Sequence, residues 1–451
     1  MDFLHFLVYC LPFSLVFGQL GRFPGFGGET RVYIWDVLVF LIVGVWLVEK
    51  LLSQSKIKLP RFWFFLLFFN FISFLSLLNG LRWLDMGAGM VSAAYWVRWF
   101  VYTFLYFVAA DLWQQDSKFK WRLANCFLLS AVLLGLLGFL QLVIFPDLSV
   151  LDPNLGWDPH KNRLVSTWLD PNFLGAYFVL CLNLSLARLL SLPERGNKVE
   201  QERRTHNSVE VDKISKFIVG IFYFTQDLLF GIWNFLTNSM WGNILCCLVI
   251  TVALLLTFSR SAWGMMGIVL GFWGIFRLRW LLPIMAALFF SAYFFVPRVQ
   301  TRLAGITDPA DSSQMRIVSW QRTLEIIKDY PVLGVGFNAF RYAQERGGYF
   351  RDERGVPIKS GHSGAGSDSS LLLVFATTGV IGLLAYLCLL GSLGWSSFCV
   401  FRKNPDRLLS LSFFSGLLGL FAESNFINSL FFSPLLIWLW LFAANGQEEE
   451  L

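Results

Sequence analysis

The sequence predicts an all-α, polytopic membrane protein with about 12 transmembrane helices and one large extracytoplasmic loop that contains an amphipathic helix. Three observations support this fold class. The mean hydropathy of the 451 residues is +0.59. Only 15% of them are charged, against about 25% in an average soluble protein. The apolar runs are continuous and about 20 residues long, unlike the short alternating strands of a transmembrane barrel. This composition excludes a cytosolic enzyme, a secreted disulfide scaffold and a disordered protein.

Twelve apolar segments account for the predicted transmembrane helices. The first begins at Phe3 and has no small-residue cleavage site, so we expect a retained span rather than a signal peptide. In chain order the expected spans are 3–19, 31–48, 62–79, 91–112, 123–145, 171–191, 241–258, 261–276, 280–296, 369–400, 408–422 and 426–444.

Lys and Arg concentrate in the loops on one side of these spans, which predicts that this side and both chain termini are cytoplasmic. A further apolar stretch, 216–236, carries Gln226, Asp227 and Asn234. If it crossed the membrane, the charge pattern would invert halfway along the chain, so we expect it to lie at the interface. The loops rich in positive charge are 50–61, 118–122, 188–216, 277–279 and 402–407.

Four regions follow from this topology. The extracytoplasmic loop holds ten Lys or Arg against seven Asp or Glu, and this excess suits either anionic lipid headgroups or a phosphate-bearing substrate. The expected regions are 1–145 with the N-terminal transmembrane helices, 146–296 with the central helices, 297–367 with the extracytoplasmic loop, and 368–451 with the C-terminal helices. The central region includes a basic cytoplasmic loop, 193–215, before the interfacial segment.

Two of the short outer turns carry candidate anion-binding groups. Asp170 is a natural helix N-cap before Pro171, and the free N–H groups of such a helix start bind anions readily. Arg163 and Asn172 flank this start, which could also be a plain helix beginning. Arg260 lies in a turn with almost no loop, so it either snorkels at the interface or faces a lipid-linked phosphate.

The long outer loop contains a predicted amphipathic helix that carries Arg316 and Arg322. Pro331 ends this helix, and a glycine-containing turn follows it. Arg316 is a second candidate for a phosphate clamp, or else it is simply solvated. The apolar residues that recur at helical spacing are Ile317, Trp320, Leu324 and Ile327.

The end of the long loop carries His362 and Asp368. Asp368 looks like an N-cap for the next span, or else it is a functional acid. His362 is flanked by glycines, which makes a fixed catalytic position for it the less favoured interpretation.

Two charged residues fall within or beside predicted spans. Arg98 lies inside the fourth span, where a charged side chain is costly and marks a functional or paired site. Glu423 lies near the outer end of the eleventh span, as a partner for Arg98 or as a second acid of the site.

These stretches, in this order, resemble the O-antigen ligase and polymerase family of bacterial membrane glycosyltransferases. The similarity covers roughly residues 130–445. Asp368 stands where the ligases have a histidine thought to serve as base, and Ser369 stands where Asn is usual. An Asp at this position is similar to polymerase-type members. The residues that match the family pattern are Arg163, Thr167, Pro171, Asn172, Ser259, Arg260, Arg316, Trp320, Pro331, Gly334, Gly336, Gly379 and Gly382.

The resemblance implies transfer of a glycan from a polyprenyl-diphosphate carrier to an acceptor hydroxyl at the outer face of the bacterial inner membrane. The acceptor would be a glycan or a lipid, so the product is a lipopolysaccharide or exopolysaccharide. Arg260 and Arg316 would hold the diphosphate, and Asp368 would be the base. The residues expected to bind substrate are Arg163, Asp170, Asn172, Arg98, His362, Arg322 and Glu423.

The sequence suggests no metal, no other cofactor and no nucleic-acid partner. All seven cysteines lie in apolar stretches and no Cys-x-x-Cys occurs, so neither a zinc site nor a disulfide framework is expected. No Asp-x-Asp occurs either, which argues against a metal-bound nucleotide-sugar site. The family resemblance likewise implies that no metal is used.

Three other functions stay open. Another lipid-phosphosugar glycosyltransferase would carry a catalytic acid in its first outer loop, where Glu29 lies. A transporter would need broken helices and polar residues near the membrane midplane, and few are present. A flippase of lipid-linked sugars would need a continuous polar cavity between two halves.

Overall fold

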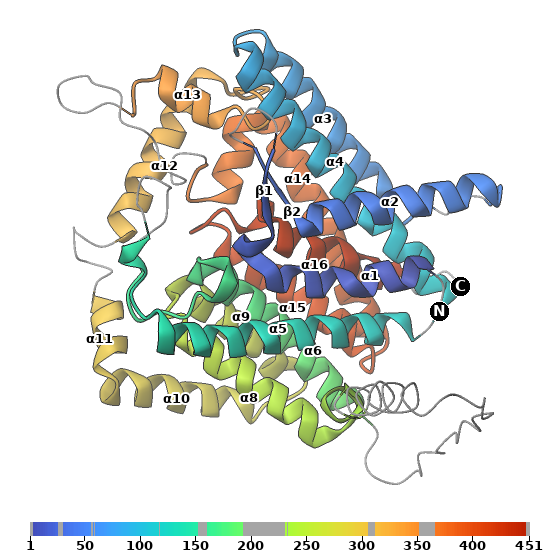
Figure 1. Ribbon diagram of the computed structural model, residues 1–451, viewed down its shortest axis with the longest axis vertical. Helices are drawn as coiled ribbons and strands as arrows, with labels where there is room; N and C mark the ends of the chain where they lie inside the picture. Colours follow the sequence, from blue (N-terminus) through green and yellow to red (C-terminus); the bar gives the residue numbers. More distant parts are fainter. Residues whose placement is uncertain are drawn as a thin grey trace, which may run out of the picture.

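A computed structural model describes residues 3–25, 30–55, 57, 59–116, 118–151, 160–192, 231, 233–304, 312–350 and 366–447. Helices dominate this part of the chain (Figure 1). They are α1 (Phe3–Ser14), α2 (Ile34–Leu52), α3 (Trp63–Leu81), α4 (Met86–Gln115), α5 (Phe119–Ile144), α6 (Pro171–Ser191), α8 (Met240–Leu256), α9 (Arg260–Phe276), α10 (Leu281–Phe295), α11 (Pro297–Ala304), α12 (Ser312–Asp329), α13 (Phe340–Arg346), α14 (Ser370–Lys403), α15 (Leu408–Glu423) and α16 (Ser433–Ala443).

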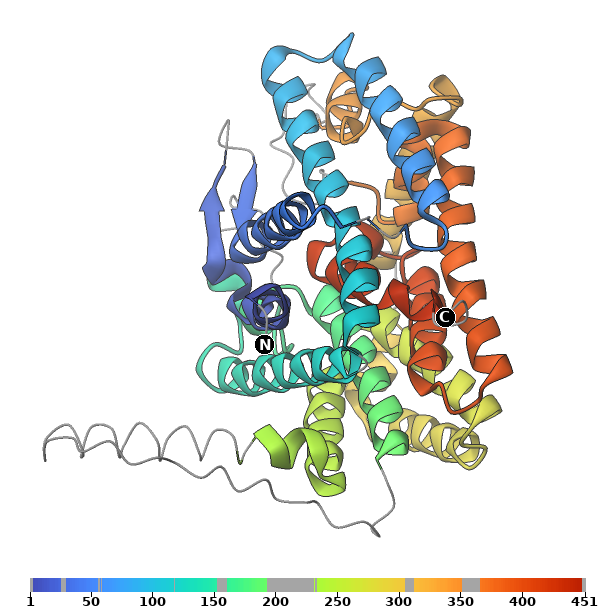
Figure 2. The same cartoon turned by 90° about the vertical axis from the view of Figure 1, so that its right-hand side faces the viewer.

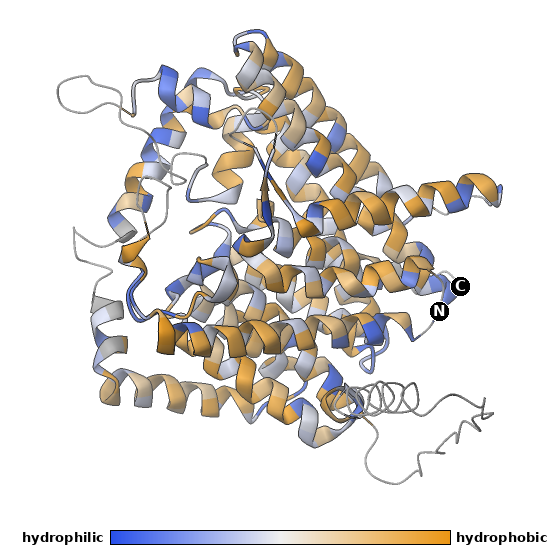
Figure 3. Cartoon of the chain, viewed as in Figure 1, coloured by the Kyte–Doolittle hydropathy of each residue, from blue (hydrophilic) through white to orange (hydrophobic). Residues whose placement is uncertain are grey.

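Each expected span has a helix, so the prediction of an all-α polytopic membrane protein is confirmed in its main feature. By length and composition, five helices in the described part of the chain can cross a membrane. Four shorter ones are equally apolar. Hydrophobic residues cover α5, α8 and α10, whereas hydrophilic residues gather on α12 and α13 (Figure 3). The number of spans and their cytoplasmic or outer orientation stay predictions.

The last span differs most from its expected form. The sequence suggested one apolar run over 426–444, but α16 begins only at Ser433, with a proline in its first turn. Residues before it form a turn and the 3₁₀ segment η7 (Ser429–Phe431). The 11 residues of α16 span about 16 Å at 1.5 Å per residue. The polar hairpin that this leaves at the end of α15 is important for the site.

The N-terminal part holds a feature that the hydropathy pattern did not indicate. Two short strands, β1 (Arg22–Pro24) and β2 (Arg31–Tyr33), pair in antiparallel register between α1 and α2. Figure 2 shows this hairpin beside the two helices, which are seen nearly end-on. The 3₁₀ segment η1 (Leu15–Gly21) joins α1 to the hairpin and packs against a second one, η4 (Ser166–Trp168).

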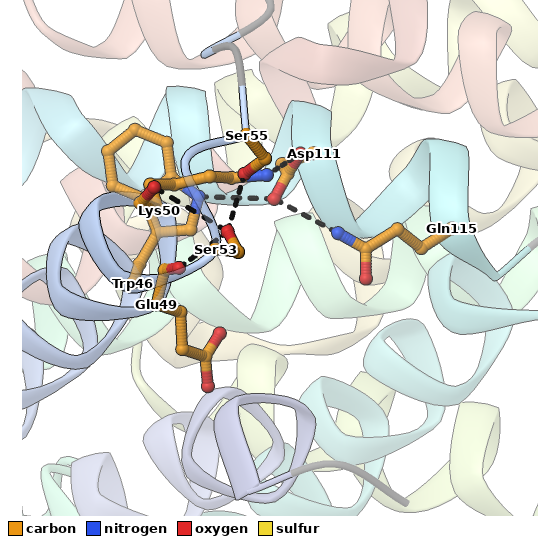
Figure 4. A network of polar contacts seen from close by, with 7 residues as sticks. All are labelled: Trp46, Glu49, Lys50, Ser53, Ser55, Asp111 and Gln115. Carbon is orange, nitrogen blue, oxygen red and sulfur yellow. Dashed lines mark hydrogen bonds and ion pairs between the residues drawn. The ribbon is translucent and has the colours of Figure 1, made fainter.

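Two ion pairs join α2 and α4, one near each end of α2. Near the start of α2, Asp36 pairs with Arg98 in the middle part of α4 at 2.6 Å. Near the end of α2, Lys50 pairs with Asp111 of α4 at 2.7 Å, where Trp46 also donates a hydrogen bond (Figure 4). Because each helix contributes one acid and one base, the two pairs fix the relative register of the helices.

Helices α6, α9 and α15 pack against one another at the centre of the bundle. The side chain of Asn183 on α6 accepts a hydrogen bond from the Trp273 indole at 2.6 Å and donates one to the Ser412 carbonyl at 2.6 Å. This buried amide therefore links all three helices. Gly175 allows α6 and α9 to approach closely, since an added Cβ would lie 2.7 Å from the Cβ of Ala262.

Candidate functional site

Helices α6, α9 and α14 begin, and α15 ends, at one end of the bundle, which we call the motif end. The start of α6 has the predicted capping: the Asp170 carboxylate accepts hydrogen bonds from the backbone N–H groups of Asn172 (2.7 Å) and Phe173 (3.2 Å). Ser259 caps α9 by accepting from the Ala262 N–H at 3.4 Å. Arg260 is therefore the first residue of α9 and lies directly beside this cap.

Arg163 and Asn172 connect the two helix starts. The Arg163 guanidinium, which is 9% exposed, donates to the Thr257 carbonyl at 2.8 Å and to the Asn172 side-chain oxygen at 3.3 Å. The same oxygen accepts from the Ser259 hydroxyl at 2.9 Å. Since these bonds to protein groups engage both side chains, they support a positioning role for Arg163 and Asn172. Their predicted contact with substrate stays a prediction.

The amphipathic helix predicted in the long loop is present as α12, and it docks on the start of α14. The Trp320 indole donates to the carbonyl of Asp368 at 3.2 Å, and the Asp368 N–H donates to the Ser319 hydroxyl at 3.1 Å. Thr323 donates to the Ser367 hydroxyl at 2.9 Å. Arg316 is one turn before Trp320, so it belongs to the same side of α12.

The apolar residues that predicted an amphipathic helix along the membrane do not all share one environment. Ile327 is buried and Trp320 packs beside Phe426, whereas Ile317 and Leu324 are 40% and 46% exposed. That α12 lies along the membrane stays a prediction. Thr323 is fully buried instead, because its hydroxyl bonds to the Ser367 hydroxyl and it lies toward α14.

The predicted N-cap of α14 is wrong by one residue. Ser369, and not Asp368, is the N-cap, and its hydroxyl accepts from the Leu372 N–H at 3.3 Å. Asp368 therefore precedes the helix, with its main chain fixed by Ser319 and Trp320. Of the two alternatives for Asp368, an N-cap or a functional acid, the structure excludes the N-cap.

The hairpin after α15 joins the same assembly. The Ser370 N–H donates to the Ser424 carbonyl at 2.7 Å, and the Leu430 N–H donates to the Ser370 hydroxyl at 3.1 Å. The rings of Trp320 and Phe426 lie 6.0 Å apart. These contacts bring the starts of α14 and η7, the end of α15 and one side of α12 together, although α12 and α15 are about 100 residues apart in the chain.

The Gly-x-Gly turn after α12 anchors the long loop to the membrane helices. Gly334 and Gly336 have positive φ values of 69° and 121°, as expected for a turn. The N–H groups of Val335 and Gly336 donate to the carbonyls of Ala376 (2.9 Å) and Thr377 (3.2 Å) on α14. These carbonyls are available because Gly379 interrupts the helix with φ 69° and ψ −173°. The turn therefore has a packing role that accounts for its glycines.

Glu423 is buried at the motif end, within electrostatic range of Arg316. The Glu423 carboxyl is 2% exposed, and the charged groups near it are Asp170 and Arg316. Arg98 lies elsewhere: it pairs with Asp36, which also accepts from the Tyr102 hydroxyl at 2.5 Å. The suggestion that Glu423 is the partner of Arg98 is therefore wrong, and Arg98 has a structural partner that the sequence analysis missed.

The remaining candidates lie apart or outside the described residues. Arg322 lies over the Tyr349 ring at 5.6 Å, where a hydrogen bond to the Glu325 carboxylate raises the pKa of Tyr349 to about 12. His362, Glu29, the loop 193–215 and most of 216–236 lie outside the described part of the chain.

Some groups that complete the motif end carried no signal in the sequence. Ser319, Thr323 and Ser370 are ordinary hydroxyl residues whose importance comes from contacts across the fold. Asp36 did carry a signal, because it is an acid within an apolar run and such residues are normally paired.

Among the described residues, no group of three or more His, Cys, Asp or Glu side chains could hold a metal ion. All seven cysteines are free thiols.

Comparison with known proteins supports the family resemblance. No curated protein matches the chain. Residues 245–387 match the family model described as O-antigen ligase. This region begins within α8, ends within the interrupted helix α14 and includes Arg260, Arg316 and Asp368. The protein is thus a multi-pass membrane protein that is similar to the O-antigen ligase family over residues 245–387.

Proposed function

We propose that the protein is a metal-independent glycosyltransferase that moves a glycan from a polyprenyl-diphosphate carrier to an acceptor hydroxyl at the outer face of the membrane. The observation that carries this proposal is the docking of α12 on the start of α14. It joins Arg316 and Asp368 through the Trp320 and Ser319 contacts within the family region. Arg260 begins α9 at the same end of the bundle.

The reaction needs charge stabilisation more than covalent chemistry. The bond between the anomeric carbon and the diphosphate oxygen breaks, and the diphosphate leaves with the electron pair. Arg260 and Arg316 would form charge-assisted hydrogen bonds that strengthen as this charge develops. The acceptor oxygen forms the new bond to the anomeric carbon.

Asp368 would take the proton of the acceptor hydroxyl. An ordinary carboxylate is a weak base, so the proton would move late, when the bond to the diphosphate is nearly broken. The two hydrogen bonds to its main chain hold Asp368 in place, and a positioned acceptor lowers the barrier further. Arg163 and Asn172 would act on Arg260 indirectly, by fixing the adjoining turn.

Between the two activities of the family, Asp368 favours a polymerase over a ligase. Purified protein would be incubated with a polyprenyl-diphosphate oligosaccharide in the presence of a metal chelator, and released polyprenyl diphosphate would be measured. A longer lipid-linked glycan identifies a polymerase, whereas release only after addition of a different acceptor identifies a ligase. No release with any acceptor contradicts the proposal.

Variants at the three residues test their roles. We expect Arg260→Ala, Arg316→Ala and Asp368→Asn each to lower transfer at least about a hundredfold, since each removes charge stabilisation or a base. Asp368→His should retain measurable transfer, because an imidazole can also accept the proton. Arg277→Ala is the matched control, since this arginine pairs with Asp406 at 2.8 Å near the other end of α9. Full activity in Arg260→Ala and Asp368→Asn would refute the assignment.

Glu29→Gln separates this proposal from the other type of lipid-phosphosugar glycosyltransferase. We expect this substitution to leave transfer unchanged, because the proposed base is in the long loop. A loss of transfer comparable to that of Asp368→Asn would favour the catalytic acid in the first outer loop instead.

A further inference from the structure

The carboxyl of Glu423 is buried without a hydrogen-bond partner. It is 2% exposed, and neither of its oxygens accepts a hydrogen bond from the described residues. The Ser429 hydroxyl nearby is also buried and unpartnered. The hydroxyls of Ser261 and Ser429 lie close to the carboxyl but do not reach it with hydrogen-bond geometry. Three adjacent polar atoms are therefore left without partners at the motif end.

This position is unfavourable for a carboxylate on its own. Glu423 is the last residue of α15, and the negative end of a helix dipole repels an acid. Asp170 adds a second negative group nearby, against the one positive charge of Arg316. Buried polar groups are almost always hydrogen-bonded in folded proteins, so an unpaired one calls for a functional explanation.

The backbone around Glu423 does not depend on its side chain. The Ser424 N–H donates to the Leu420 carbonyl at 2.8 Å, and the Phe426 N–H donates to the Glu423 carbonyl at 2.9 Å. The Ser370 N–H holds the Ser424 carbonyl at 2.7 Å. The hairpin is fixed by these main-chain bonds, so the carboxyl contributes nothing visible to its geometry.

The unpartnered oxygens of Glu423 and Ser429 restrict which kind of ligand can bind beside them. Both carboxyl oxygens can accept hydrogen bonds, and a protonated carboxyl also donates one, so the ligand must be rich in groups that donate and accept. An anionic ligand is disfavoured beside the two acidic side chains Glu423 and Asp170. Phe426, which is 45% exposed, adds an apolar face beside these polar groups, and such a combination is typical of small-molecule sites. Sugar hydroxyl groups on a ring with apolar C–H faces satisfy all of these conditions.

We propose that Glu423 and Ser429 form a subsite that binds hydroxyl groups of a sugar residue, beside the diphosphate held by Arg316. This inference rests on the proposed function for the identity of the neighbouring diphosphate, but the subsite itself is defined by the unpartnered atoms. The sugar belongs to the donor glycan or to the acceptor glycan. Glu423 is thus a specificity-determining residue, whereas Asp368 keeps the role of base.

The experiment measures binding rather than turnover. The probes are polyprenyl diphosphate without sugar, the same carrier with its glycan purified from the producing cells, and the free oligosaccharide released from that carrier. Wild-type protein should bind the glycan-linked carrier at least about tenfold more tightly than the bare carrier, because only the glycan supplies hydrogen bonds to the buried, unpartnered groups. Glu423→Gln should remove most of this difference and leave the affinity for the bare carrier unchanged.

The free oligosaccharide identifies which glycan is bound. Loss of its binding in Glu423→Gln assigns the subsite to the acceptor, and loss confined to the glycan-linked carrier assigns it to the donor. Asp36→Asn is the matched control, because Asp36 is a buried carboxyl with all its partners in the protein. It should leave the affinity for every probe unchanged.

A structural role for Glu423 gives a different result. If the carboxyl only supports the fold, Glu423→Gln unfolds at a lower temperature and binds all three probes equally weakly, which overturns the proposal. Unchanged binding of the glycan-linked carrier also overturns it. Should Glu423→Gln fail to fold, Ser429→Ala tests the same subsite, and an unchanged glycan preference would then refute it. Absence of transfer with Glu423-dependent glycan binding would refute only the proposed function.

Discussion

Among the residues that the structure describes, two carboxyl groups are buried, and their surroundings differ completely. Asp36 is 4% exposed and lies in the first turn of α2, where the helix dipole favours an acid. It accepts hydrogen bonds from the Tyr33 N–H (2.8 Å), the Arg98 guanidinium (2.6 Å) and the Tyr102 hydroxyl (2.5 Å). Glu423 is 2% exposed, ends α15 and accepts none from the described residues.

The difference teaches how to separate structure from function among charged residues in membrane helices. A charge with all its partners in the protein, like Asp36, holds two helices together and has no capacity left for a ligand. A charge without partners destabilises the folded protein, and it is retained where a ligand supplies the missing bonds. Burial alone does not distinguish the two cases, whereas the hydrogen-bond partners do.

The largest expected effect is at Asp36. Asp36→Ala leaves the Arg98 guanidinium buried without its counter-charge, which should lower the free energy of unfolding by about 3–5 kcal/mol. Thermal unfolding in detergent, followed by tryptophan fluorescence, would measure the loss. The double variant Asp36→Ala with Arg98→Met should recover much of the stability, because replacing both partners by apolar groups removes the unpaired charge. Wild-type stability of Asp36→Ala would contradict the contrast between Asp36 and Glu423.

The second largest effect is expected at Glu423, where a substitution should stabilise the protein rather than destabilise it. Glu423→Met removes an unsatisfied buried carboxyl and should raise the free energy of unfolding by about 1–3 kcal/mol, while the glycan preference of the protein is lost. The same unfolding measurement, combined with binding of the bare and the glycan-linked carrier, checks both parts. A less stable Glu423→Met protein would mean that the carboxyl has partners in the folded state, and the contrast with Asp36 would then disappear.

Much of the fold could be predicted because it depends on local sequence. Apolar runs indicated the helices, and Asp170 and Pro171 marked the start of α6 correctly. The prediction was less accurate where a choice depended on tertiary contacts. Both Asp368 and Ser369 are good N-cap residues, and only the docking of the Asp368 main chain on α12 leaves Ser369 to cap α14.

The site could be predicted in its parts but not in its assembly. The motifs indicated Arg260, Arg316 and Asp368, but the docking of α12, which carries Arg316, on the start of α14 depends on the return of the long loop to the membrane helices. That return requires the positive φ at Gly379, where an added Cβ would lie 2.0 Å from the Val332 carbonyl oxygen. Neither hydropathy nor charge records such a backbone feature, so the docking of the long loop on α14 could not be predicted from them.

Asn172 provides a third, intermediate test, since it lies in the candidate site but has partners. Asn172→Ala removes an acceptor shared by Arg163 and Ser259. We expect a loss of about 1–1.5 kcal/mol in the free energy of unfolding. Transfer should also fall, because the turn that carries Arg260 loses a support. If stability falls but transfer per folded molecule does not, the turn is held by the remaining Arg163 bond to the Thr257 carbonyl.

The smallest effect is expected at the other end of α2 and α4. Asp111 accepts from Lys50 at 2.7 Å, Trp46 at 3.2 Å and Gln115 at 3.0 Å (Figure 4). Its side chain is 13% exposed, so water can replace part of what Asp111→Asn removes, and the loss should be about 0.5–1 kcal/mol.

Transfer and glycan binding should stay unchanged in Asp111→Asn. The hydrogen-bond partners of Asp111 are Lys50, Trp46 and Gln115, and none of them belongs to the motif end. The loss of stability should shrink at high salt, because partly exposed ion pairs are screened. A large loss in the free energy of unfolding that does not depend on salt would mean that Asp111 contributes as strongly as Asp36. The exposed fraction of a paired side chain would then not predict its contribution to helix packing.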